Sequence, residues 1–236
     1  MSVLTPPAPP ADPTTPPPRS TRGIEPGQLL VLHHVSYASY VAMADAIVDR
    51  PNVRFTYDRG ALEIMTLSPE HERLKYLLGR LIDTLAEELN VRIGGFGSTT
   101  YRRQEAERGL EPDQCYYMTN LHRVRRKTRI DLAVDPPPDL AIEIDVTNSS
   151  VDRLEVYAGL NIPEVWRWTG ESISVFRLNP AGGYDEGAAG SAFVPELPVA
   201  ELVRFVRIGE SEDDTEMVRA FRAWVRQFLA DHGLTS

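Results

Sequence analysis

The clearest pattern of polar and apolar positions lies between residues 139 and 147, where the two kinds alternate almost strictly. Side chains of a β-strand point alternately to its two faces, so the alternation predicts a strand. Asp139, Glu143 and Asp145 share one face of it. A solvated strand face is the simple alternative, but carboxylates held close together repel one another unless a cation lies among them, so this strand is predicted to be a metal-binding edge. The opposite face carries Leu140, Ile142, Ile144 and Val146.

A second strong pattern begins at Ser68-Pro69, a typical helix N-cap followed by a first-turn proline. Leucines recur at helical spacing from there to about Asn90, and Glu70 and His71 project onto the same face. Further predicted helices are 36–47, a short one from Ser149 or Ser150 to Leu160, 199–206 and 216–229. Predicted strands are 53–57 and 62–65, which form a hairpin, 91–100, 99–104, 113–118, 164–168 and 172–178.

These elements predict a mixed sheet flanked by helices, of the α/β or α+β class. Proline dominates residues 6–18, so residues 1–27 are predicted to be a disordered tail. Residues 28–236 are expected to form a single domain, with 199–236 as a C-terminal helical appendage. The last helix has an apolar face, which leaves room for a homodimer contact.

Composition narrows the functional classes. The net charge of −9 argues against non-specific wrapping of nucleic acid but allows a local basic groove. The lone cysteine, Cys115, excludes an internal disulfide and a cysteine-rich zinc site, which fits a cytoplasmic protein. No apolar run approaches the roughly 20 residues that a membrane-spanning helix needs.

Candidate chemistry centres on Asp113 and Glu143, which are expected on neighbouring strands, with Asp145 two residues further on. Carboxylates from two strands make an oxygen-rich site that suits Mg²⁺ or Mn²⁺. Such an ion activates water and neutralises a phosphate, and Arg153 from the next helix can stabilise the charge of the transition state. His71 can join this site from the start of the long helix.

A dense basic run follows the predicted strand 113–118. A solvated loop is the default interpretation of such a run, and phosphate binding is the alternative. Its members are Arg123, Arg125, Arg126, Lys127 and Arg129.

Several separated motifs resemble the PD-(D/E)XK nuclease superfamily and, within it, a bacterial family of restriction-endonuclease-like proteins, the Uma-two family. The resemblance covers about residues 36–180. It rests on Ser68-Pro69-x-His71, Gly97-Ser98-Thr99-Thr100, Gly109-Leu110-Glu111-Pro112-Asp113, Pro138-Asp139 through Glu143, and Tyr157-Ala158 through Ile162-Pro163-Glu164-Val165-Trp166.

The resemblance implies a restriction-endonuclease-like fold and a metal-dependent endonuclease that acts on DNA, with Asp113 and Glu143 as the metal ligands. The chain departs from the family pattern at the lysine. Asp145 stands two residues after Glu143, and Arg153 occupies the helix position where the family often has its lysine. An arginine keeps the charge but does not give up a proton as a base, so water activation falls to the metal, Asp145 or His71.

Two alternatives stay open from the sequence. One is a nuclease-fold DNA-binding protein whose catalysis has decayed, because Arg153 replaces the lysine. The other is a glycoside hydrolase that uses Asp113 and Glu143 as an acid–base pair without Mg²⁺.

Overall fold

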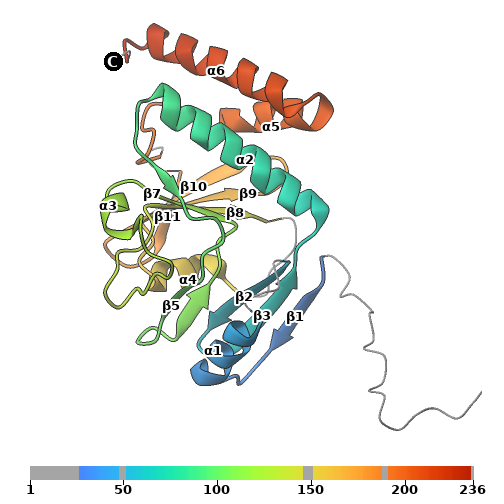
Figure 1. Cartoon of the computed structure of the whole chain (residues 1–236), viewed down its shortest axis with the longest axis vertical. Coiled ribbons are helices and arrows are strands. Elements are labelled where there is room, and N and C mark those ends of the chain that lie inside the picture. The colour runs from blue at the N-terminus through green and yellow to red at the C-terminus, as the bar shows by residue number, and fades with distance from the viewer. Residues whose placement is uncertain (1–26, 48–51, 146–150, 188–190, 235–236) are drawn as a thin grey trace, which may run out of the picture.

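The computed structural model describes residues 27–47, 52–145, 151–187 and 191–234. The predicted disordered tail lies almost entirely outside these ranges. The described chain is a mixed α+β structure with two separate sheets, and helices cover both faces of the second sheet (Figure 1). The predicted α+β class is therefore confirmed. None of its described helices is both long and apolar enough to cross a bilayer.

The first sheet is antiparallel throughout and has the strand order β1-β3-β2-β6-β5. Helix α1 (Tyr37–Ala46) begins at the Ser36 cap and packs Tyr40 against Tyr57 of the predicted hairpin. The strands are β1 (Leu29–Leu32), β2 (Val53–Asp58), β3 (Ala61–Thr66), β5 (Tyr101–Arg103) and β6 (Arg108–Leu110).

The second sheet has the order β11-β10-β9-β8-β7-β4, and only the pair β8·β9 within it is parallel. Parallel neighbours need a crossover connection, which here contains helix α4 (Arg153–Gly159). The strands are β4 (Gly94–Gly95), β7 (Gln114–Tyr117), β8 (Leu140–Ile144), β9 (Glu164–Trp168), β10 (Ile173–Leu178) and β11 (Tyr184–Glu186).

Helices cover the two faces of the second sheet differently. Helix α2 (Pro69–Glu88) packs on the face that carries Leu140, Ile142 and Ile144, and α5 (Leu202–Ser211) and α6 (Asp214–Asp231) cover α2 in turn (Figure 1). Helix α4 packs on the opposite face and also contacts β2 and β6 of the first sheet. This places α4 between the two sheets.

The last helix uses its apolar face within the chain. Met217, Phe221, Val225 and Leu229 of α6 are buried in the core that contains α2 and α5. The apolar face that suggested a homodimer contact is therefore already occupied. The 3-10 turn Val199–Glu201 leads into α5.

Several local predictions need correction. Glu70 is exposed at the start of α2 whereas the next residue, His71, is buried, since successive residues of a helix point about 100° apart. Helix α4 is capped by Asp152, whose carboxylate accepts from the N–H groups of Leu154 and Glu155, and the serines predicted to cap it lie outside the described residues. Short strands β1, β6 and β11 have no counterpart among the predicted elements, since three or four residues leave little periodicity to detect.

Candidate active site

The register of β7 and β8 places the two principal acids opposite each other. Gln114 pairs with Ile142 in this antiparallel ladder, so the next position along it sets Asp113 opposite Glu143. Directly opposite residues project from the same face of a sheet, here the face covered by α4. Both side chains are buried, Asp113 with 1% and Glu143 with 4% of its surface exposed. All five residues of β8 are buried, so the alternative of a solvated acidic strand face does not apply to Glu143.

One oxygen of Asp113 has partners and the other has none. Oδ2 accepts a hydrogen bond of 2.8 Å from the backbone N–H of Ile144, and His71 Nε2 lies 3.1 Å from it. Oδ1 is buried without a hydrogen-bond partner in the described part of the chain. A buried carboxylate oxygen without a partner is costly, which makes Oδ1 a place where a bound ion or ligand would be stabilising.

Glu143 is held by two side chains of α4. Arg153 Nε lies 2.6 Å from Oε1, and Arg153 Nη2 donates to Oε2 at 2.9 Å. The hydroxyl of Tyr157, one helical turn further on, donates to the same Oε2 at 2.5 Å. A guanidinium that meets both oxygens of a carboxylate fixes its orientation as well as its charge.

Arg153 also joins the second sheet to the first. Its Nη1 donates to the hydroxyl of Thr56 on β2, and its Nη2 donates to the backbone carbonyl of Glu111 at 3.2 Å. Only 7% of the arginine surface is exposed. The guanidinium is therefore anchored from three sides, and its position depends on the packing of the two sheets around α4.

The His71–Asp113 contact favours the charged form of both groups. Burial lowers the pKa of His71, but the Asp113 carboxylate outweighs it and the net pKa is raised above 6.5. Burial likewise raises the pKa of Asp113, and His71, Arg153 and the Ile144 N–H together bring it below 3.8. The two shifts have the signs expected for a negative Asp113 beside a positive His71.

Glu143 is the acid with the opposite shift. Burial raises its pKa to about 7, Arg153 opposes the change and the charge of Asp113 adds to it. Burial raises the pKa of the Tyr157 hydroxyl as well, so this group stays protonated and acts as a donor. Two acids that face each other thus differ in how readily they ionise, a feature that is enriched at functional sites.

The other acids of the opening pattern separate into two roles. Asp139 accepts from the backbone N–H groups of Met118 and Thr119 at 2.7 and 3.2 Å, and so fixes the turn that follows β7. Asp145 follows β8 directly and is partly exposed, with its backbone N–H bonded to Trp168 on β9. Asp145 and Asp139 are therefore both partly open to solvent, whereas Asp113 and Glu143 are buried.

The basic run lies at the other end of β7 from Asp113. Its residues form and follow the short helix α3 (Leu121–Val124), and all five side chains are exposed. The length of β7 separates the run from Asp113 by roughly 13 Å. Lys127 pairs with Asp135, and Arg123 donates to the Val134 carbonyl, so two of the five cations have local partners.

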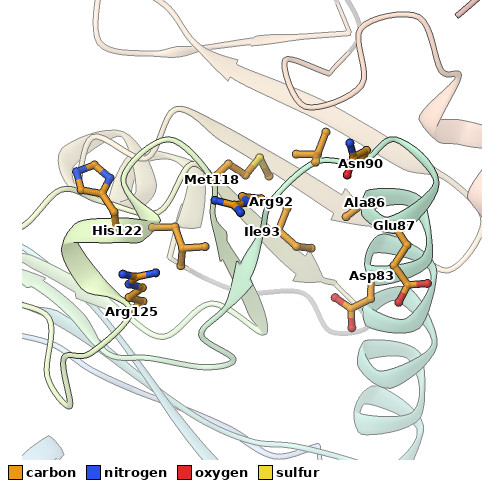
Figure 2. Close-up of a pocket in the computed structure, with 11 residues that line it drawn as sticks. Asp83, Ala86, Glu87, Asn90, Arg92, Ile93, Met118, His122 and Arg125 are labelled. Carbon is orange, nitrogen blue, oxygen red and sulfur yellow. The ribbon is translucent and has the colours of Figure 1, made fainter. Parts of the chain in front are cut away.

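A pocket of about 800 Å³ opens beside the basic run, not at the buried acids. Figure 2 shows His122 of α3 and the following Arg125 on one side of it, and Asp83 and Glu87 of α2 on the other. Its lining carries both signs of charge and includes none of the candidate catalytic residues. We therefore place the candidate chemistry at the acid pair, where the unpartnered oxygen and the shifted pKa values lie.

Sequence reasoning missed three groups around the acids. Tyr157 stands one turn after Arg153, and this spacing was a usable signal for a shared partner. The contacts of Arg153 with Thr56 and with the carbonyl of Glu111 could not be predicted from local sequence patterns, because these residues are 97 and 42 positions away from it along the chain.

The donor set fits a hard divalent ion held by few protein ligands. In the described residues, no three histidine, cysteine or carboxylate side chains gather into a complete metal site. Mg²⁺, however, usually keeps several waters and binds through one or two carboxylates. Asp113 Oδ1, which has no partner, and Glu143 Oε1, which meets only Arg153 Nε among the described contacts, are oxygens of that kind.

Comparison with known proteins agrees with the class that these acids indicate. The sequence model of the Uma2 family, described as "Putative restriction endonuclease", matches residues 37–203. The chain belongs to this family, which confirms the resemblance seen in its motifs. A crystal structure of "a putative nuclease belonging to DUF820 from Anabaena variabilis ATCC 29413" is similar with a TM-score of 0.44 and 14% identity, over 74% of this chain and 97% of that one. No curated protein matches the chain.

Proposed function

We propose that the protein is a metal-dependent endonuclease that hydrolyses phosphodiester bonds of DNA at the Asp113–Glu143 pair. The observation that carries the proposal is the buried, unpartnered Oδ1 of Asp113 beside a second carboxylate. Membership of a restriction-endonuclease family supports the same reaction class.

Asp113 Oδ1 and Glu143 Oε1 would hold the ion, either Mg²⁺ or Mn²⁺. When bound, such an ion lowers the pKa of water and neutralises phosphate charge. In the reaction a water oxygen bonds to phosphorus and the water passes a proton to Asp145. The bond between phosphorus and the leaving sugar oxygen breaks, and the leaving oxygen takes up a proton from solvent. His71 holds Asp113 by its Oδ2, which leaves Oδ1 free for the ion.

Proton transfer is assigned to Asp145 in preference to His71. His71 Nε2 lies 3.1 Å from Asp113 Oδ2, so the histidine is assigned the role of positioning Asp113, and its raised pKa favours the form that does not accept a further proton. Asp145 is partly exposed and follows Glu143 by two residues, so it is assigned the transfer of protons between the site and solvent. Arg153 and Tyr157 orient Glu143.

The basic run is proposed as a DNA contact remote from the acids. The side chains of Arg125, Arg126 and Arg129 are exposed, and cations of this kind contact phosphates without regard to sequence. Substituting them is expected to weaken DNA binding and its salt dependence without removing the cation site.

A second candidate is a nuclease-fold DNA-binding protein without cleavage. The contact between Arg153 and both oxygens of Glu143 favours it, since that carboxylate is already paired. DNA binding that falls with added salt, in the absence of metal-dependent cutting, would select this candidate.

The test is cleavage of a supercoiled plasmid by the purified chain with Mg²⁺, with Mn²⁺ and with a chelator. Asp113→Asn and Glu143→Gln are each expected to lower the rate by about 100-fold or more, because each removes a charge from the site. Glu212→Gln, the same change at an exposed acid between α5 and α6, is the matched control and is expected to cut like the wild type. Cutting that persists in both site variants, or in the chelator, would contradict the assignment.

A further inference from the structure

Arg153 stands in an unusual relation to the proposed cation site, because it is itself a cation that contacts one of the two acids. Its Nε lies 2.6 Å from Glu143 Oε1, and its Nη2 donates to Oε2 at 2.9 Å. With Asp113 and Glu143 ionised, the acid pair carries two negative charges, and Arg153 compensates one of them. A divalent ion therefore meets a less negative site than the two carboxylates alone would offer.

The guanidinium does not turn away from Glu143 freely. Its Nη1 donates to the hydroxyl of Thr56 on β2, its Nη2 donates to the backbone carbonyl of Glu111, and only 7% of the arginine surface is exposed. The packing of both sheets thus fixes the cation against the carboxylate. A side chain held in this way competes with any ion for Glu143 in every copy of the folded protein.

We propose that Arg153 is a built-in competitor for the divalent ion, which holds Glu143 in one orientation and makes the cation site weak. The inference rests on the proposed function, because it concerns the same pair of acids. Arg153 is thereby given a positioning role, in which it determines the concentration of Mg²⁺ or Mn²⁺ needed to fill the site. Thr56 and Tyr157 determine how tightly Arg153 and Glu143 are held together.

Lysine is a useful contrast at this position. A single ammonium is a point charge and does not span both carboxylate oxygens while it also reaches Thr56 and Glu111. Glutamine removes the charge and keeps a polar group of moderate length. The affinity for Mn²⁺ is therefore expected to rise in the order wild type, Arg153→Lys, Arg153→Gln.

Calorimetric titration with Mn²⁺, checked by the electron paramagnetic resonance signal of the free ion, measures this order without any cleavage assay. Arg153→Gln is expected to bind Mn²⁺ about 10-fold more tightly than the wild type, because the positive charge that competes for Glu143 is removed. The double variant E143Q/R153Q is expected to lose that gain, because the second ligand is gone. A purely structural role for Arg153 predicts no such gain.

The outcomes separate the two proposals. Equal, measurable affinity in the wild type and Arg153→Gln would overturn the competitor role and leave the cation site standing. No Mn²⁺ binding in any variant would overturn the cation site itself. If Arg153→Gln does not fold, Thr56→Val is the second variant. Valine is well accommodated in strands and removes the hydroxyl that accepts from Arg153 Nη1, so a rise in the affinity for Mn²⁺ is still expected. Unchanged affinity in Thr56→Val would then count against the inference.

Discussion

At the residue scale, the site is a set of buried polar groups whose hydrogen bonds are only partly made. In the described part of the chain, Asp113 Oδ1 and both ring nitrogens of His71 have no hydrogen-bond partner, although His71 Nε2 lies 3.1 Å from Asp113 Oδ2. Glu143 accepts hydrogen bonds from Arg153 and Tyr157. Asp113 accepts one from the Ile144 N–H on Oδ2, the oxygen that also lies near His71 Nε2. Inside a protein such hydrogen bonds are strong, and a buried polar atom that has no hydrogen-bond partner lowers the stability of the fold. The unpartnered Asp113 Oδ1 is therefore the atom around which a function is most reasonably proposed.

Tyr157→Phe tests the positioning of Glu143. The change keeps the ring and removes the donor to Oε2, so we expect the free energy of unfolding to fall by about 2 kcal/mol, as for a bond to a charged group. Removing a group that orients a ligand is also expected to slow metal-dependent DNA cleavage by roughly 10-fold. Denaturant unfolding and plasmid cleavage measure the two effects.

Tyr184→Phe is the matched control, because its hydroxyl donates to the carbonyl of Ile162, a neutral partner outside the site. It is expected to cost about 1 kcal/mol of stability and to leave cleavage unchanged. Equal cleavage by the two variants would remove Tyr157 from the site.

At the element scale, ion pairs join α2 and α6 at one end of the helical layer. Glu88 accepts from Arg226 Nε at 2.6 Å and from Arg222 Nη1 at 2.5 Å, while Glu87 receives Arg222 Nη2 at 2.8 Å. The side chain of Glu88 is 10% exposed and that of Glu87 is 64% exposed. Pairs of this kind contribute more when they form a partly buried network than when they stand alone.

Glu88→Gln is expected to lower stability in a manner that depends on pH. The hydrogen bonds from Arg226 and Arg222, against a smaller effect of burial, hold the folded-state pKa of Glu88 below 4.5. A depressed carboxyl pKa stabilises the fold above the unfolded value and loses that effect as pH falls through the folded value. Urea unfolding should show a loss of about 1 kcal/mol at neutral pH, allowing for solvent screening, and a smaller gap below about pH 4.

Glu87→Gln makes the same chemical change at the neighbouring, more exposed position. Its effect is expected to be smaller, at about 0.5 kcal/mol or less. A gap between wild type and Glu88→Gln that does not change between neutral and acidic pH would show that the charge is not its cause.

At the scale of the whole molecule, we propose that residues 28–236 fold as one cooperative unit, including the C-terminal helices. Leu202, Phe205 and Phe221 share a core with Leu77 of α2 and Trp166 of β9. Burial of this kind stabilises each side chain by roughly 1.5 to 3 kcal/mol. The helices from residue 199 onward therefore support α2, and α2 carries His71 to the site.

Deleting residues 199–236 is expected to prevent folding, because the outer face of α2 would then meet water. Circular dichroism should show loss of a cooperative thermal transition, and the chain should aggregate. A chain ending at residue 231, after α6, is the control and should melt as the full chain does. A truncated chain with a sharp transition near the full-length midpoint would mean that the helices are a separate appendage.

The sequence by itself determined the elements with long, regular patterns and the residues with a local signature. Alternation located β8, leucine spacing located α2, and the carboxylate pattern with the Pro-Asp motifs led to the prediction that Asp113 and Glu143 form the site. These signals are local, because the periodicity of a helix or strand is written into neighbouring residues.

Only the tertiary structure decided which groups meet. The sequence did not separate the N-terminal strands into a sheet of their own, and so it gave no sign that Thr56 touches Arg153. The sequence also predicted that Arg153 lies beside the acids, but not that its guanidinium contacts both carboxylate oxygens of Glu143. Contacts across many positions depend on how the sheets pack around α4, and that packing settles which oxygen of the acid pair is left free.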